Sequence, residues 1–265
     1  MLSFESLLMH VPALMLVLTR LGGLFIFTPV ISSAIIPPQI KALLLVMLTL
    51  AIYPTLDLHE TVPVSMDLAT LAPMMAAEML IGAAIGLAAF VPAASLQLAG
   101  LFMGQQMGLA IASVLNPAID LEGNSIGQLL YYLGVATYVS VGGLDMLFLA
   151  VVNTYDAVAP GAATIAAAPL DFLVALIHSG FVLAFRVALP VVTIIFLESL
   201  AVGFIMKTVP SLNIMSFGFP IRIIVGLFVL MVAIILISDA IVAEFDLAMA
   251  MLQQWLDDLA PRSTP

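Results

Sequence analysis

The chain has 265 residues, of which 64% are hydrophobic and 8% charged, and its formal net charge is −10. Its mean hydropathy is +1.27. A soluble domain would be about half apolar and a quarter charged, so this composition excludes one and indicates an integral membrane protein. The acidic balance argues against nucleic acid and anionic lipid surfaces as partners, and without cysteine there is no disulfide framework.

Six apolar segments are long enough to cross a bilayer, which takes about 20 residues of helix. They run over residues 7–28, 36–54, 70–100, 125–152, 173–206 and 219–243. The sequence therefore predicts an all-α fold of the integral membrane type. The third and fifth segments would each extend roughly 45–50 Å as straight helices, beyond a hydrocarbon core of about 30 Å. We expect these long helices to tilt, to kink at Pro92 and Pro190, or to stand partly outside the bilayer in other protein.

The stretches outside these segments differ in character. Residues 1–10 hold no Lys or Arg, so we expect no cleavable signal peptide. We expect residues 55–69 to form an acidic aqueous loop, residues 153–171 a second loop, and residues 206–220 a hairpin turn. The tail over 244–259 reads as an amphipathic helix. Its apolar face would carry Phe245, Met249, Leu252, Leu256 and Leu259, and its polar face Asp246, Gln253 and Asp257.

The basic residues predict an orientation. Lys41, Lys207 and Arg222 gather near one set of segment ends, whereas only Arg262 lies near the other set. By the positive-inside rule the 28–41 and 206–222 connections face the cytoplasm, and both termini face the opposite side.

The predicted helices contain the charged residues Arg20, Glu78, Arg186 and Glu198. Ionisable groups inside such helices are costly and call for a named partner. One hypothesis is a set of ion pairs that fixes helix packing, Arg20 with Glu78 and Arg186 with Glu198. The other is a proton or ion relay, but a relay favours acids clustered on one face near the midplane. The acids here are too sparse to show such a cluster, so pairing is the favoured interpretation.

A polar, glycine-rich stretch over residues 104–124 separates the third and fourth segments. Irregular backbone at membrane depth is tolerated only inside protein or along a water-filled cavity. The stretch is therefore either an aqueous turn or an element that lines or blocks a pathway. The candidate pathway residues are Met103, Gly104, Gln105, Met107, Gly108, Ile111, Val114, Leu115, Asn116 and Pro117. The seal itself lies either with the two methionines or with the apolar run from Ile111 to Leu115.

Several short motifs carry no chemistry here. Gly82 and Gly86 form a G-x-x-x-G pattern, which allows close helix packing without naming the partner helix. Residues 123–127 match the G-x-S-x-G of hydrolases, but that motif needs a strand–turn–helix elbow followed by an acid and a histidine. Here it opens an apolar helix, where Asn124 or Ser125 is a natural N-cap. The three histidines are scattered, so no metal site is predicted. The sequence also has no H-E-x-x-H, P-loop or dinucleotide motif, so neither a cofactor nor an enzymatic activity is predicted.

A turn-like pattern near the C-terminus resembles a known family. The run from Pro210 to Gly226 contains Asn213, Gly218 and Pro220, in the order P-x-L-N…G-x-P. It resembles the FliR family, the flagellar type III protein-export gate subunits with SctT-type counterparts in injectisomes.

Two further patterns agree with this resemblance, which extends over essentially the whole chain. One is the start, with residues 20–23, Pro29, and Pro37-Pro38 before Lys41; the other is the middle, with residues 104–108, Asn116-Pro117 and Gly142-Gly143. There are two departures. Leu144-Asp145 follow the glycine pair where the family often has histidine, and Asn116 stands where the family commonly has Asp-Pro.

The resemblance implies a single export-gate domain over 1–265, with a FliP-like part over 1–172 and a FliQ-like hairpin and tail over 173–265. It implies assembly with FliP-type, FliQ-type and FlhB-type subunits in the bacterial inner membrane at the flagellar basal body. Unfolded flagellar proteins would be the substrates, and the 104–124 stretch would plug the channel. It also implies that Lys207, Pro210, Asn213, Gly218 and Pro220 belong to a cytoplasmic turn.

A stand-alone secondary transporter or channel is the alternative. Such a protein would carry inverted repeats and broken helices that converge on polar groups near the midplane. No convincing repeat relates the two halves of the chain, and the 104–124 stretch lacks a substrate-sized polar cluster. A pure scaffold that only organises partner subunits is a third interpretation.

Overall fold

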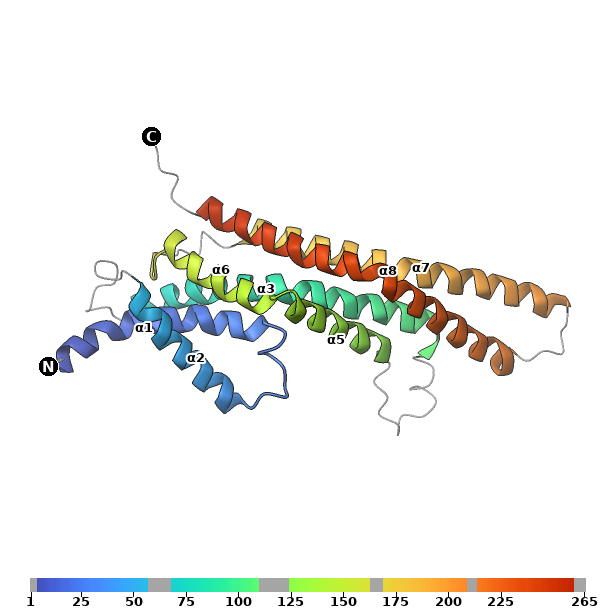
Figure 1. The fold of residues 1–265 in the computed structure, drawn as a ribbon, viewed down its shortest axis with the longest axis horizontal. Helices are drawn as coiled ribbons and strands as arrows, with labels where there is room; N and C mark the ends of the chain where they lie inside the picture. The colour runs from blue at the N-terminus through green and yellow to red at the C-terminus, as the bar shows by residue number, and fades with distance from the viewer. Residues whose placement is uncertain (1–3, 57–67, 110–123, 163–168, 209–213, 260–265) are drawn as a thin grey trace. The chain divides into compact units, whose positions relative to one another are not determined.

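A computed structural model describes residues 4–56, 68–109, 124–162, 169–208 and 214–259 (Figure 1). Every regular element within these ranges is a helix, so the all-α prediction is confirmed. The elements are α1 (Phe4–Phe27), α2 (Pro38–Ile52), the 3₁₀ turn η1 (Tyr53–Thr55), α3 (Leu68–Gln106), α5 (Ser125–Ser140), α6 (Gly143–Ala157), α7 (Leu170–Thr208) and α8 (Ile214–Leu259).

The helices fit the predicted membrane character. Five described helices are long and apolar enough to cross a membrane, or up to six if α5 and α6 make one span. Both α3 and α7 have 39 residues, and the helix continues through Pro92 in α3 and Pro190 in α7. At about 1.5 Å per residue each helix is roughly 58 Å long. Both helices therefore exceed the hydrocarbon core of about 30 Å by more than their apolar segments predict.

The chain divides into two compact units built from segments far apart in sequence. The first comprises Met1–Phe90, Tyr138–Leu176 and Asp246–Pro265, and the second comprises Val91–Thr137 and Ile177–Phe245. The long helices α3, α7 and α8 therefore contribute residues to both units.

In the first unit, α2 packs along α1. The His10 Nδ1 and Tyr53 hydroxyl groups lie 2.6 Å apart, and a groove of about 190 Å³ between the helices is lined by apolar side chains and Thr49. Lys41 closes the connection between these helices, because its Nζ donates to the carbonyl oxygens of Ser32 at 3.1 Å and Ser33 at 2.8 Å. One of the basic residues used for the orientation prediction thus also has a structural role.

In the second unit, α7 and α8 form an antiparallel hairpin, running side by side in Figure 1. The turn is shorter than the predicted 206–220, because α8 begins at Ile214. Gly218 and Pro220 therefore lie within the first turns of α8, while Lys207 is exposed in the last turn of α7. Pro210 and Asn213 lie outside the described residues.

The predicted helical tail is confirmed, but it is not a separate helix. Helix α8 runs without interruption for 46 residues to Leu259. Within 244–259 the side chains of Phe245, Leu252 and Leu256 are buried, and those of Asp246, Gln253 and Asp257 are exposed. The amphipathic pattern therefore extends the last apolar span as one rod.

The apolar segment predicted over 125–152 is not one continuous helix, because the helix breaks between α5 and α6, although the two together can still make one span. Gly142 has φ +76°, a left-handed conformation that an α-helix cannot contain and that glycine adopts without strain. The Tyr138 hydroxyl donates to the Gly143 carbonyl at 2.6 Å, and its ring packs on Gly143, where any side chain would overlap it. The Tyr138 side chain therefore packs across the break and joins the end of α5 to the start of α6 within the first unit.

Candidate functional site

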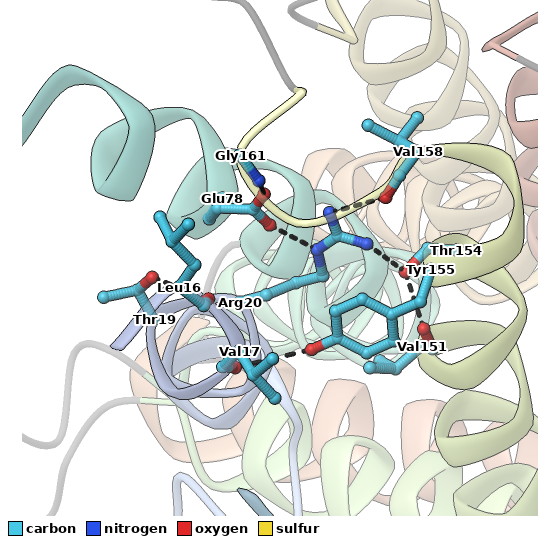
Figure 2. Close-up of polar contacts among 10 residues, drawn as sticks. All are labelled: Leu16, Val17, Thr19, Arg20, Glu78, Val151, Thr154, Tyr155, Val158 and Gly161. Atoms are coloured by element: carbon cyan, nitrogen blue, oxygen red, sulfur yellow. Dashed lines mark hydrogen bonds and ion pairs between the residues drawn. The ribbon is translucent and has the colours of Figure 1, made fainter. Parts of the chain in front are cut away.

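A buried ion pair joins α1 to α3 in the first unit. Arg20 and Glu78 are both 0% exposed, and the Arg20 Nε donates to the Glu78 Oε2 at 2.5 Å (Figure 2). The predicted pairing of these two residues is confirmed. A pair this deeply buried is maintained only when further hydrogen bonds satisfy its remaining polar atoms.

The structure supplies those hydrogen bonds. The Arg20 Nη1 donates to the Thr154 hydroxyl at 2.9 Å, and its Nη2 donates to the Val158 carbonyl at 3.0 Å. The Glu78 Oε1 accepts from the Gly161 amide at 2.9 Å. The guanidinium carbon also lies 4.3 Å from the centroid of the Tyr155 ring, within the range of a cation–π contact. Figure 2 shows the guanidinium enclosed by these groups from α3, α6 and the chain after it.

The helix crossing at this pair depends on glycine. A side chain on Gly82 would collide with the Arg20 carbonyl, and one on Gly23 would collide with the α3 backbone at Met79. Gly86 likewise meets Leu24 and Phe27 of α1. The G-x-x-x-G of residues 82–86 therefore packs against α1, and the close approach brings Arg20 within reach of Glu78. These contacts favour a packing role for the pair over a relay.

The second predicted pair is wrong. Arg186 and Glu198 lie on the same continuous helix α7, where twelve residues separate them by about 18 Å. Glu198 instead contacts α8: the Arg222 Nε lies 3.5 Å from its Oε2, and the Arg222 Nη2 donates to the Ser199 hydroxyl at 2.8 Å. This contact ties the two helices of the hairpin together near its turn.

Arg186 has a different electrostatic partner, Glu244 of α8. Glu244 lies beyond the apolar span Gly218–Ile235 and is buried, with no hydrogen-bond partner for its Oε1. Burial raises the pKa of the Glu244 carboxyl, and a hydrogen bond from Ser179 and the charge of Arg186 partly oppose that rise.

The polar stretch starts at the end of α3, and this root of the stretch is firmly packed in the second unit. Helix α3 continues through Gly104 to Gln106, and Gly108 then turns the chain with φ +79°, its amide donating to the Gln105 carbonyl at 3.0 Å. Met103 and Met107 are both 0% exposed. Met107 lies on Gly226 of α8, where a side chain would overlap its thioether arm.

The other end of the stretch is packed against α3. Helix α5 begins at Ser125, and a side chain on Gly127 would collide with the Gln97 carbonyl and with Asn124. Gly100 of α3 in turn has no space for a side chain, because the backbone of Gly127 lies against it. The glycine that completes the hydrolase-like motif thus serves helix packing.

The remaining pathway candidates cannot be placed in the same way. Ile111, Val114, Leu115, Asn116 and Pro117 lie outside the described residues. Gln105 is exposed beside a groove of about 190 Å³, which it lines with Gln106 and the stacked rings of Phe102 and Phe185. The stretch is therefore anchored by buried residues at each end, Met103 and Met107 on one side and Ile126 and Gly127 on the other, and an amide-lined groove lies next to the first.

Sequence reasoning missed several of these residues. Thr154, Tyr155 and Gly161 all lie in the loop predicted over 153–171, although the first two belong to α6, and no periodicity links them to Arg20. In the sequence, Gly226 marks only the end of the FliR-like pattern. An isolated glycine within the apolar run of α8 was the available signal, since such a glycine often marks a close approach of another group.

Comparison with known proteins assigns the chain to a family. The family model described as bacterial export proteins, family 1, matches residues 11–248. The chain belongs to this family. It is 27% identical to the flagellar biosynthetic protein FliR of Bacillus subtilis over 248 residues, 92% of this chain and 95% of that protein.

Other relatives come from both flagellar and secretion systems. The chain is 28% identical to the flagellar biosynthetic protein FliR of Escherichia coli over 79% of each chain. It is 27% identical to the Yop proteins translocation protein T of Yersinia pestis, over 78% of this chain and 80% of that protein. The predicted FliR-family membership is therefore confirmed for this export protein.

Proposed function

We propose that this export protein is a subunit of the flagellar type III export gate, where it helps form and close the channel for unfolded flagellar proteins. The observation that carries the proposal is the family match over 11–248, with relatives named for flagellar biosynthesis and for translocation. These relatives do not favour a stand-alone transporter. The role we assign is structural and requires no cofactor.

The packed roots support a plug role for the polar stretch. Met107 is held on Gly226, and the start of α5 is held on α3 through Gly100 and Gly127. Because both roots are fixed to helices of the same unit, opening would involve the residues between them. We assign the seal to the apolar run from Ile111 to Leu115, and an anchoring role to Met103 and Met107, because both methionines are already buried within this chain.

Exposed apolar faces support assembly with other subunits. On α7 and α8 large apolar side chains are exposed at Phe181, Phe185, Phe196, Phe204, Ile224, Phe228, Met231 and Ile235. Such a surface requires lipid or protein contact. We propose FliP-type, FliQ-type and FlhB-type subunits as partners, with 1–172 acting as the FliP-like part and 173–265 as the FliQ-like hairpin. The assembly would sit in the inner membrane at the basal body, with the turn after Lys207 on the cytoplasmic side.

Co-expression with FliP-type and FliQ-type proteins tests this function. We expect one stable complex in mild detergent, and we expect loss of the gene to abolish secretion of flagellar proteins until the gene is restored. Recovery of a monomer or a simple homodimer, with secretion intact in the deletion strain, would contradict the proposal. A secretion defect confined to virulence proteins would instead identify an injectisome system.

A further inference from the structure

A groove between the start of α7 and the last turns of α8 has no assigned role. It has a volume of about 340 Å³ and lies entirely within the first unit. The start of α7 forms one side and the last turns of α8 form the other. The lining residues include Phe172, Met251 and Trp255, with Asp171 and Asp258.

The apolar part of the groove is built on stacked aromatic rings. The rings of Phe172 and Trp255 lie 5.6 Å apart between centroids, with planes inclined by 21°. Phe172 is buried, whereas Trp255 is only partly covered. Indole is the best aromatic partner for a cation, since its face carries negative electrostatic potential. A partly covered indole in a groove is thus suited to receive a cationic group.

The charges around the groove favour the same kind of ligand. Asp171 and Asp258 are both exposed, and none of the described Lys or Arg residues lines the groove. Asp171 lies in the first turn of α7, where a carboxylate offsets the positive end of the helix dipole. The end of α8 is different: Asp257 and Asp258 lie beside the negative end of the dipole, and no basic residue lies in that last turn. A cation supplied by another molecule would reduce the repulsion between these carboxylates and the negative end of the α8 dipole.

We propose that this groove binds an arginine or lysine side chain of a neighbouring protein subunit. The charged head would lie over the exposed part of the Trp255 ring, between Asp171 and Asp258, and the aliphatic stem would lie against Met251. The groove is remote in sequence from the 104–124 stretch and from the ion pair at Arg20. We assign the site to attachment of a partner rather than closure of the channel, and as a contact between subunits it rests on the proposed function.

The first test uses the fluorescence of Trp255, the only tryptophan in the chain. The purified full chain in detergent is titrated with the blocked tripeptide Ac-Ala-Arg-Ala-NH₂, with Ac-Ala-Gln-Ala-NH₂ as the neutral probe. We expect a saturable change in emission with the arginine peptide alone. D171N and D258N should each weaken binding by up to about fivefold, the upper end of the range for one exposed charge pair.

The matched control is D257N, which removes the neighbouring charge outside the groove lining and should change binding less than twofold at physiological salt. Equal weakening by D257N, or no saturable change with millimolar arginine peptide, would overturn the proposal. The competing occupant is Arg262 of the chain itself. If R262Q strengthens peptide binding several-fold, the chain's own tail fills the groove and the proposal is wrong.

The second test addresses the partner in the assembled apparatus. Reversing both groove charges in D171K/D258K should lower recovery of co-expressed subunits severalfold, while D246K/D257K should leave it unchanged. Equal recovery with both double variants would exclude a subunit contact here. Because the peptide titration needs no assembly, failure of the groove and failure of the export function are distinguished.

Discussion

At the residue scale the central feature is the buried ion pair of Arg20 and Glu78, whose polar atoms are all hydrogen-bonded. Arg20 contacts a carboxylate, a hydroxyl, a carbonyl and an aromatic ring, and Glu78 also accepts from the Gly161 amide. Removing both charges from such a pair is often neutral, whereas removing one leaves the other buried and unpaired. We therefore expect the cluster to be sensitive to single changes.

The substitution E78A should lower the free energy of unfolding by about 3–5 kcal/mol, because it strands the Arg20 guanidinium inside the first unit. The double variant R20M/E78M should recover much of that loss. Thermal unfolding in detergent measures both. E198A is the control, since its partner Arg222 has a side chain that is 36% exposed and the pair should contribute about 1 kcal/mol or less. A double variant as unstable as E78A would contradict this account.

The same residues show how far sequence alone reaches. The pairing of Arg20 with Glu78 was predictable because intramembrane charges need partners and these two have few alternatives. The pairing of Arg186 with Glu198 failed because α7 is continuous and keeps them about 18 Å apart. The hydrogen-bond partners Thr154 and Gly161 could not be predicted, because tertiary packing and the loop after α6 bring them to the Arg20–Glu78 pair.

At the element scale glycine decides which helices touch. The backbones of α1 and α3 meet at Gly23 and Gly82, and those of α3 and α5 meet at Gly100 and Gly127. The existence and approximate position of the apolar helices could be predicted from the sequence, but not their full length, since α3, α7 and α8 all extend beyond their apolar segments. The break at Gly142 could not be predicted, because the glycine pair there looks the same as the glycines inside helices.

Substituting Gly82 tests the helix crossing. G82A should destabilise the protein by about 1–3 kcal/mol, because the added methyl meets the α1 backbone at Arg20, which cannot rotate away. The matched control is G203A, also within a long helix, where nothing lies near the added methyl. G203A should be neutral or stabilising by up to about 1 kcal/mol, since alanine favours helix. Equal thermal stability of the two variants would show that the crossing tolerates a side chain.

At the scale of the whole molecule the account predicts a topology as well as a fold. The chain contains no cysteine, so single cysteines can be introduced without background. Cysteines at Asp57 and Lys207 should react with a membrane-impermeant maleimide from opposite sides of the membrane. The expectation follows from the number of spans and the positive-inside rule. Labelling of both positions from one side would overturn the assignment of segments to spans.

The claim that the polar stretch closes the channel is the most consequential one. It is tested by replacing residues 110–120 with a Gly-Ser segment of equal length, which keeps α3 and α5 connected but removes the apolar run. The control is the same replacement over 57–67, an equally long connection between α2 and α3. Ion conductance is measured for each co-purified assembly in liposomes. We expect the 110–120 variant to leak ions while the wild-type and control assemblies stay closed; a 110–120 variant as tight as the wild type would contradict the plug role.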